Sequence, residues 1–214
     1  QDGVFRDETG TPVARPAGGS VVIDPDAVRA AAAAKEKQRD DAGAKAGTST
    51  GAQTQTKREE PKLCPDPGPE NIKGRKLFDV QYEQYVRNIV NPQRQPPLPA
   101  GLAFSLTDPA TGKPVKYDDC RESDGAMIEA KGHYAEMMRP DWDKGLDILS
   151  SKWTQQATSQ VSASGGRDIE WYFHEQAAAD YAEQLFSNFD DLRRIRIYFM
   201  PDPAGIPNPN SRIK

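Results

Sequence analysis

Apolar and polar residues alternate with a period of two in a short segment near the middle of this 214-residue chain. Ile128 and Ala130 are apolar and are interleaved with Glu129 and Lys131. This period is typical of a β-strand with one face on an apolar layer. Glu129 and Lys131 therefore point to the same face, about 7 Å apart along the strand. A carboxylate and an ammonium group displayed together beside an apolar layer indicate a candidate site.

The pattern between residues 61 and 214 predicts several further helices and strands. Apolar stripes at helical spacing alternate with short runs of β-branched and aromatic residues. The predicted elements are helices over Gly74–Val90, Asp141–Val161 and Tyr172–Phe186, and strands over Ala103–Thr107, Val115–Asp119 and Ile195–Met200. Together with the Glu129–Lys131 strand, this order predicts an α/β fold in which a mixed sheet is flanked by helices.

The segment before the Glu129 strand is predicted to form the other arm of a hairpin. The sequence Ser-Asp-Gly at 123–125 favours a tight turn, so the preceding strand folds back. A turn centred between residues 123 and 124 places Asp118 directly opposite Glu129, with their Cβ atoms about 5 Å apart. A register shift of one residue would bring Asp119 to this position instead. The two opposed carboxylates can share a divalent cation, with Lys131 beside them.

Two neighbouring carboxylates and a lysine are what metal-dependent hydrolysis of a phosphodiester needs. Mg²⁺ prefers oxygen ligands, keeps several waters and takes one or two carboxylates from the protein, and Mn²⁺ can replace it. The cation polarises the phosphate and favours formation of hydroxide from bound water. Lys131 can orient or deprotonate that water, or stabilise the extra negative charge. We therefore predict that Asp118 and Glu129 hold Mg²⁺ and that Lys131 is catalytic.

The spacing from Asp118 through Glu129 to Lys131 resembles the motif of the PD-(D/E)xK nuclease superfamily. Over roughly residues 63 to 203, the chain also resembles restriction-endonuclease-fold toxin family 5. The resemblance rests on the segments Val115–Asp118, Ile128–Tyr134, Asp168–Phe173 and Tyr198–Pro201. At Asp119 the family more often has Gly, so the resemblance leaves open which of the two adjacent aspartates is the ligand.

This resemblance implies a restriction-endonuclease-like fold and a Mg²⁺-dependent endonuclease that cleaves DNA. Family members are C-terminal toxin domains of bacterial polymorphic toxins. They are often delivered by type VI secretion into the cytoplasm of a target cell and are neutralised by an immunity protein. In the superfamily a backbone carbonyl between the acid and the lysine also binds metal, which implicates Ala130. A glutamine from the next helix and an acid from the first helix often lie near the metal, which implicates Gln160 and Glu83.

The composition divides the chain into two parts. Residues 1–60 contain one aromatic residue, Phe5, and nine Lys/Arg against ten Asp/Glu, so they carry −1 of the total charge of −4. They cannot form a core and are predicted to be a largely disordered tether with one Ala-rich helix over Ala27–Arg39. Residues 61–214 form the predicted nuclease domain. We expect the upstream part of the chain to contact a component of the secretion apparatus.

The charge and the remaining composition restrict the other possibilities. Neither part is basic, so the protein does not hold DNA by its overall field. Cys64 and Cys120 are too few for a disulfide scaffold, and we expect reduced thiols. No run approaches 18 apolar residues, so no membrane span is predicted. The chain starts with Gln1 and shows no signal-peptide pattern, and we expect it to be the C-terminal piece of a longer protein.

Two other functions are compatible with the same residues. A domain of this fold that has no catalytic activity could serve as a binding or adaptor module. In that case Glu129 and Lys131 would belong to an ordinary exposed strand face. An RNase toxin is the other alternative, because RNA and DNA present the same phosphodiester to the site.

Overall fold

The computed structural model describes residues 21–22, 63–202 and 211–213. Apart from Val21 and Val22, the predicted tether lies outside these residues, and so does the predicted helix over Ala27–Arg39. Within the described ranges, no helix combines the length and hydrophobicity needed to cross a bilayer.

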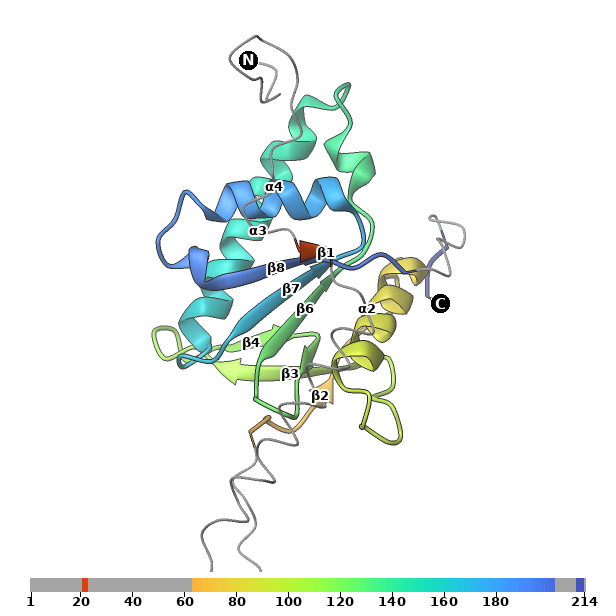
Figure 1. The fold of residues 1–214 in the computed structure, drawn as a ribbon, viewed down its shortest axis with the longest axis vertical. Coiled ribbons are helices and arrows are strands. Elements are labelled where there is room, and N and C mark those ends of the chain that lie inside the picture. The colour runs from red at the N-terminus through yellow and green to blue at the C-terminus, as the bar shows by residue number, and fades with distance from the viewer. Residues whose placement is uncertain (1–20, 23–62, 203–210, 214) are drawn as a thin grey trace, which may run out of the picture.

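A five-stranded sheet forms the centre of the described structure (Figure 1). Its strand order is β1-β8-β7-β6-β5. The strands from β1 to β6 in this order run parallel, and β5 pairs antiparallel with β6. Their bounds are β1 (Val21–Val22), β5 (Asp119–Cys120), β6 (Met127–Lys131), β7 (Ile169–Phe173) and β8 (Ile195–Phe199).

A second, three-stranded antiparallel sheet packs beside the first. Its order is β2-β3-β4, with bounds β2 (Gly68–Pro69), β3 (Leu102–Thr107) and β4 (Pro114–Tyr117). β4 leads directly into β5 through a single residue, Asp118, which forms a bend between the two strands. One bent stretch of chain therefore belongs to both sheets, and Asp118 lies at its corner.

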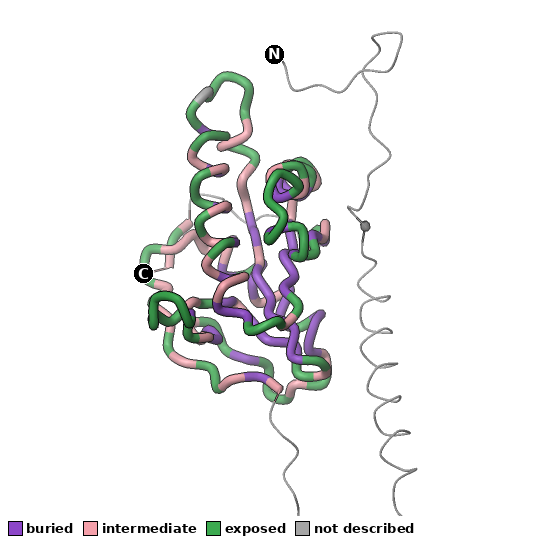
Figure 2. Tube along the Cα trace, turned by 90° about the vertical axis from the view of Figure 1, so that its left-hand side faces the viewer, coloured by how far each residue is buried: buried purple, intermediate pink, exposed green. Residues whose placement is uncertain are grey.

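Three α-helices cover the two faces of the five-stranded sheet: α2 (Leu77–Val90), α3 (Asp143–Ala163) and α4 (Gln176–Phe186). α3 connects β6 to β7 and α4 connects β7 to β8, which supplies the crossovers that parallel neighbours need. On one face α3 and α4 share a core with Trp171 of β7, and on the other α2 packs through Phe78 and Tyr82. Buried positions run along the strands, and the outer helix surfaces are exposed (Figure 2). Residues 63–202 also contain two 3-10 helices, η1 (Ala135–Met138) and η2 (Leu192–Arg194).

The predicted fold class is confirmed, because the structure is mixed α/β with sheets flanked by helices. The strand predicted over Ala103–Thr107 and the last strand over Ile195–Met200 are present within one residue of their ends. The helix predicted over Asp141–Val161 is present as α3. The first predicted helix begins three residues later than expected, at Leu77.

The helix predicted over Tyr172–Phe186 is wrong at its start. Residues 169–173 form β7, the middle strand of the larger sheet, and the helix begins only at Gln176. All five residues of β7 are buried, because helices cover both faces of this parallel strand. A strand buried on both faces does not alternate between apolar and polar residues. Its apolar run therefore merged with the Ala-rich helix that follows.

The prediction of two reduced thiols is also wrong, because Cys64 and Cys120 form a disulfide. Their Cα atoms lie 5.8 Å apart although 56 positions separate them in sequence. The bond joins the segment that leads into β2 to the edge strand β5, inside a small core that includes Phe104 and Met127. A structural disulfide of this kind is typical of proteins that fold or reside in an oxidising environment.

Candidate active site

The hairpin formed by β5 and β6 has the register that the sequence predicts. Asp119 pairs with Ile128, so continuing the register by one residue places Asp118 opposite Glu129. The connection closes through a hydrogen bond from the Gly125 N–H to the Arg121 carbonyl, with Gly125 at a φ of +77°. A positive φ favours glycine at this position of the turn. Turn geometry therefore fixes which residue of β5 faces each residue of β6.

Glu129 and Lys131 form an ion pair on the face of β6 that α3 covers. The Lys131 ammonium donates to Glu129 Oε1 at 2.7 Å and to Gln156 Oε1 of α3 at 2.7 Å. Both side chains are buried, with 6% of Glu129 and 4% of Lys131 exposed. Burial by itself would lower the pKa of Lys131, but the adjacent Glu129 carboxylate raises it above the ordinary value. Lys131 therefore stays protonated.

Gln160 on α3 completes this arrangement, which we call the lysine clamp (Glu129, Lys131, Gln156, Gln160 and Trp171). Its Nε2 donates to Glu129 Oε2 at 2.8 Å, and its Oε1 accepts from Trp171 Nε1 at 2.8 Å. The indole of Trp171 lies under the ammonium, with Lys131 Nζ 4.4 Å from the ring centroid. Three of the predicted site residues, Glu129, Lys131 and Gln160, are thus in direct contact. Both carboxylate oxygens of Glu129 already accept a hydrogen bond.

Asp118 lies at the bend between β4 and β5 and is half-buried. Its Oδ2 accepts a hydrogen bond from the Ala130 N–H at 2.7 Å, which ties the bend to β6. Burial raises the pKa of Asp118 well above its usual range, and the carboxylates of Glu129 and Glu83 raise it further. The Ala130 N–H and the Lys131 ammonium oppose this shift. Several acids therefore converge on Asp118, as in a site built for a cation.

Asp118 belongs to a group of three carboxylates, which we call the acid cluster (Glu70, Glu83 and Asp118). One oxygen from each of the three lies within 4.8 Å of the others. Oxygen donors this close together fit a hard divalent cation, so these residues could hold a metal ion. Glu129 is not a member of this group. The nearest partners of Asp118 for a metal are thus Glu83, which the family resemblance implicated, and Glu70, which the sequence did not indicate.

Arginines from α2 and the segment before it balance the acid cluster. Arg75 lies 2.9 Å from Glu83 Oε2 and 3.2 Å from Glu70 Oε2. Arg87, one helical turn after Glu83, forms a close ion pair with it and donates to the Asp118 carbonyl at 3.0 Å. Burial nevertheless raises the pKa of Glu83, against the two arginines. The cluster therefore retains a tendency to take up positive charge.

Asp119, the alternative ligand, lies in a different environment. Its side chain is fully buried and accepts from Arg94 Nη1 at 2.8 Å and from Asn91 Nδ2 at 2.8 Å. The backbone N–H of Cys120 donates to the same carboxylate at 2.7 Å. These partners lock the hairpin against the end of α2. Of the two adjacent aspartates, Asp118 is the one placed among the acids.

The sequence interpretation missed Glu70 and Arg75. Glu70 and Arg75 lie in an irregular segment rich in Pro and Gly, where no periodicity indicates which side chains face the core. Gln156 shares a helical face with Gln160, as the spacing predicts, but its contact with the Lys131 ammonium was not predicted.

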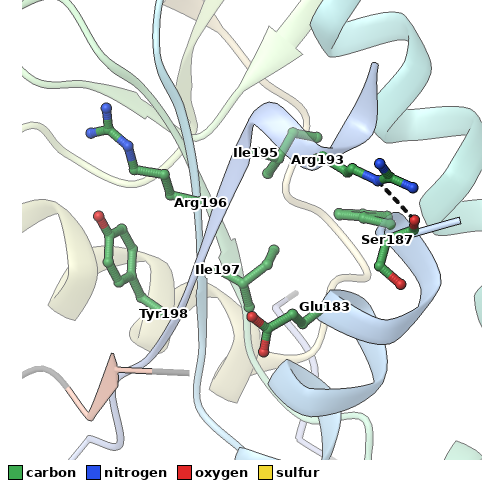
Figure 3. A pocket seen from close by; sticks show the side chains of 8 residues that line it. Glu183, Ser187, Arg193, Ile195, Arg196, Ile197 and Tyr198 are labelled. Carbon is green, nitrogen blue, oxygen red and sulfur yellow. Dashed lines mark hydrogen bonds between the residues drawn. The ribbon is translucent and has the colours of Figure 1, made fainter. Parts of the chain in front are cut away.

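A pocket of about 400 Å³ lies elsewhere, along the outer edge of β8 beside α4 (Figure 3). It is lined by Glu183, Phe186, Ser187, Arg193, Ile195, Arg196, Ile197 and Tyr198. None of these residues belongs to the lysine clamp or the acid cluster. Its arginines have other partners: Arg196 pairs with Asp168 at 2.8 Å, and Arg193 donates to the Ser187 carbonyl at 2.9 Å. The pocket is therefore separate from the candidate chemistry.

Comparisons with protein-family models, with curated proteins and with solved structures found no match for this chain. The resemblance to the toxin family stays a prediction carried by the motif residues.

Proposed function

We propose that this protein is a metal-dependent nuclease toxin that hydrolyses phosphodiester bonds of DNA. The observation that carries the proposal is the contact of the Asp118 carboxylate with the Ala130 N–H of β6, between Glu129 and Lys131 on the same strand. A cluster of oxygen donors adjoins this hairpin on one side, and a protonated lysine lies on the other. Metal-assisted phosphodiester hydrolysis needs both features in the same place.

In this proposal Asp118 holds a Mg²⁺ or Mn²⁺ ion together with Glu83 and Glu70. Glu129 and the backbone carbonyl of Ala130 are the remaining proposed ligands, as the family resemblance implies. When bound, the cation polarises the scissile phosphate and activates a water molecule. Glu129 would have to exchange one of its present hydrogen bonds, to Lys131 or to Gln160, to reach a cation.

Lys131 acts through its charge in this proposal. The Glu129 carboxylate keeps the ammonium protonated, so Lys131 is not a general base at neutral pH. A fixed positive charge beside the phosphate instead stabilises the negative charge that develops during attack. Gln156 and Gln160 hold the ammonium and its carboxylate partner in this orientation.

The biological setting is proposed from the family resemblance. The domain would be a secreted effector that acts in the cytoplasm of a competing bacterium and is neutralised by a cognate immunity protein. The upstream part of the chain would contact the secretion apparatus. The disulfide between Cys64 and Cys120 favours a route that includes an oxidising space before the target cytoplasm.

One observation favours a second candidate, a non-catalytic binding or adaptor domain of the same fold. Glu129 and Lys131 are buried and satisfy each other, as a purely structural ion pair would. An RNase toxin differs from the leading proposal only in substrate, since the phosphodiester chemistry is the same.

The test is cleavage of plasmid DNA and of total RNA by the purified full chain, with Mg²⁺, with Mn²⁺ and with EDTA. We expect DNA cleavage that EDTA stops and either cation restores. Lys131→Met should remove the activity, and Lys152→Met, an exposed lysine of α3, is the matched control. Full activity in EDTA would exclude the proposed metal chemistry. The absence of any cleavage, with DNA binding retained, would favour the adaptor domain.

A further inference from the structure

Arg75 faces all three carboxylates of the acid cluster. Its guanidinium contacts Glu83 and Glu70 directly, at 2.9 and 3.2 Å. The Asp118 carboxylate has an oxygen within 4.8 Å of an oxygen of each of these two acids. A unit positive charge thus lies where the carboxylates would otherwise repel one another. Arg75 provides part of the charge balance that a metal ion would provide.

The backbone on either side of Arg75 is held by the C-terminal segment 211–213. The Ile213 N–H donates to the Arg75 carbonyl at 3.0 Å, and the Leu77 N–H donates to the Ser211 carbonyl at 2.8 Å. Lys76 pairs with Arg212 in an antiparallel bridge. The backbone is therefore fixed, while 31% of the Arg75 side chain is exposed to solvent. The guanidinium can change partners without any movement of the chain.

The second arginine of the cluster cannot do the same. Arg87 is 2% exposed and donates to the carbonyl groups of Asp118, Pro99 and Leu102 as well as pairing with Glu83. Moving it would leave several buried carbonyls without a donor, which is costly. Lys116, another nearby cation, is 53% exposed and lies 4.0 Å from Glu70. Arg75 is thus the one cation among these three that contacts two acids of the cluster and is also free to leave.

We infer that Arg75 is the counter-ion of the acid cluster in the metal-free protein, and that a divalent cation displaces it. The displaced guanidinium then binds a phosphate of the nucleic acid at the same site. This inference rests on the proposed function for its substrate class. The three carboxylates cannot give full contacts to both a cation and Arg75. A planar guanidinium is well suited to bidentate binding of phosphate.

The inference predicts that removing the charge of Arg75 has opposite effects on two affinities. In calorimetric titrations of the full chain with Mn²⁺, Arg75→Gln should bind the ion about tenfold more tightly, because a competing charge a few Å away is gone. Arg75→Lys keeps the charge and should stay near the wild type. Lys73→Gln, an exposed lysine two residues earlier, is the matched control and should not change the affinity.

Binding of a duplex DNA oligonucleotide, measured with Ca²⁺ in place of Mg²⁺, should respond in the other direction. Arg75→Gln should weaken DNA binding although it strengthens cation binding. A merely structural arginine would lower both affinities through loss of folding, which urea unfolding of the variant would reveal.

Equal or weaker Mn²⁺ binding by a folded Arg75→Gln protein would overturn the inference. Unchanged DNA binding would overturn the transfer of Arg75 to phosphate. Tighter Mn²⁺ binding and weaker DNA binding, in a protein that cleaves nothing, would support the role of Arg75 while the proposed nuclease activity fails.

Discussion

The lysine clamp and the acid cluster, which includes Asp118, differ in how their charges are balanced. In the clamp, Glu129 accepts from Lys131 and Gln160, and the Lys131 ammonium also contacts Gln156 and the Trp171 ring. In the cluster, Arg75 pairs with Glu70 and Glu83 and Arg87 pairs with Glu83, while Arg87 donates to Asp118 only at its backbone carbonyl. In the clamp the charges of Glu129 and Lys131 balance, whereas the cluster has three acids and two arginines.

This difference indicates which of the two regions is stabilised by binding a cation from solution. A metal can reach Glu129 only if this carboxylate gives up a hydrogen bond to Lys131 or to Gln160. A group of convergent, partly buried acids is stabilised by any cation that can enter. The clamp is therefore suited to present a fixed positive charge, and the cluster is suited to recruit a removable one.

The largest effect is expected from opening the clamp. Lys131→Ala leaves the Glu129 carboxylate buried without its cation, which should cost about 3–5 kcal/mol of the free energy of unfolding. The double variant Glu129→Gln, Lys131→Met removes both charges and should recover most of this loss, although not the cleavage activity. Urea denaturation of the single and double variants measures this. A single variant as stable as the wild type would mean that the pair is solvated and that the clamp is not complete.

The disulfide stabilises the surroundings of the acid cluster more than those of the lysine clamp. It fixes β5, whose neighbour Asp118 belongs to the cluster, and closes a loop of 56 positions. Replacing Cys64 and Cys120 with Ser should lower the free energy of unfolding by roughly 4 kcal/mol from chain entropy alone. We expect weaker Mn²⁺ binding by this variant at temperatures where it remains folded. Equal stability of the oxidised and reduced protein in urea would contradict this prediction.

Replacing each of the two adjacent aspartates in turn separates an effect on cleavage from an effect on stability. Asp118→Asn should reduce cleavage by about 10²–10³-fold, because it removes a ligand of the cation, with little effect on stability. Asp119→Asn should do the reverse: it weakens a buried, charged hydrogen bond to Arg94 and should cost about 1–3 kcal/mol. Activity and urea unfolding of each variant, measured side by side, test the assignment. Loss of activity in a stable Asp119→Asn protein would move the ligand to Asp119.

The features that the sequence predicted well are those determined by neighbouring residues. The period of two in β6 and the turn at residues 123–125 are local, and together they are enough to place Asp118 opposite Glu129. The helix α3 was predicted from residues 141–161 themselves, whereas Gln160 on it was implicated by the family resemblance. Each of these features depends on residues close together in the chain, so one sequence contains the information.

The features that the sequence did not predict depend on distant contacts. Glu70 reaches Asp118 across 48 positions, and Cys64 reaches Cys120 across 56, with no local signal at either end. β7 was not predicted as a strand because burial on both faces removes the alternation that identifies a strand. The acid cluster is therefore a product of how the second sheet and α2 fold around the bend at Asp118.

The smallest expected effect is a loss of stability in mild acid, which reaches the acid cluster through α2. The His174 ring packs edge-on against Phe78 and Tyr82 of α2, with centroids 4.9 and 5.3 Å apart. Burial lowers the pKa of His174 below 6.5, and the nearby His133 lowers it further, whereas Glu175 and Asp202 act in the opposite direction. A histidine with a depressed pKa contributes stability that is present above its unfolded pKa and is lost as the pH falls through its folded pKa.

We therefore expect the wild type to lose stability below pH 6.5 and His174→Gln to lose less. The measurement is the urea midpoint between pH 7.5 and 5, with EDTA present so that cation binding does not contribute. His174→Phe is the matched variant, because it keeps an aromatic ring against Phe78 and Tyr82 but cannot take up a proton, and it should also lose less stability than the wild type. Protonation of His174 should loosen its packing against α2, the helix that carries Glu83. Mn²⁺ affinity should therefore fall over the same pH range in the wild type more than in His174→Gln. Parallel pH profiles for wild type and His174→Gln would show that acid acts elsewhere.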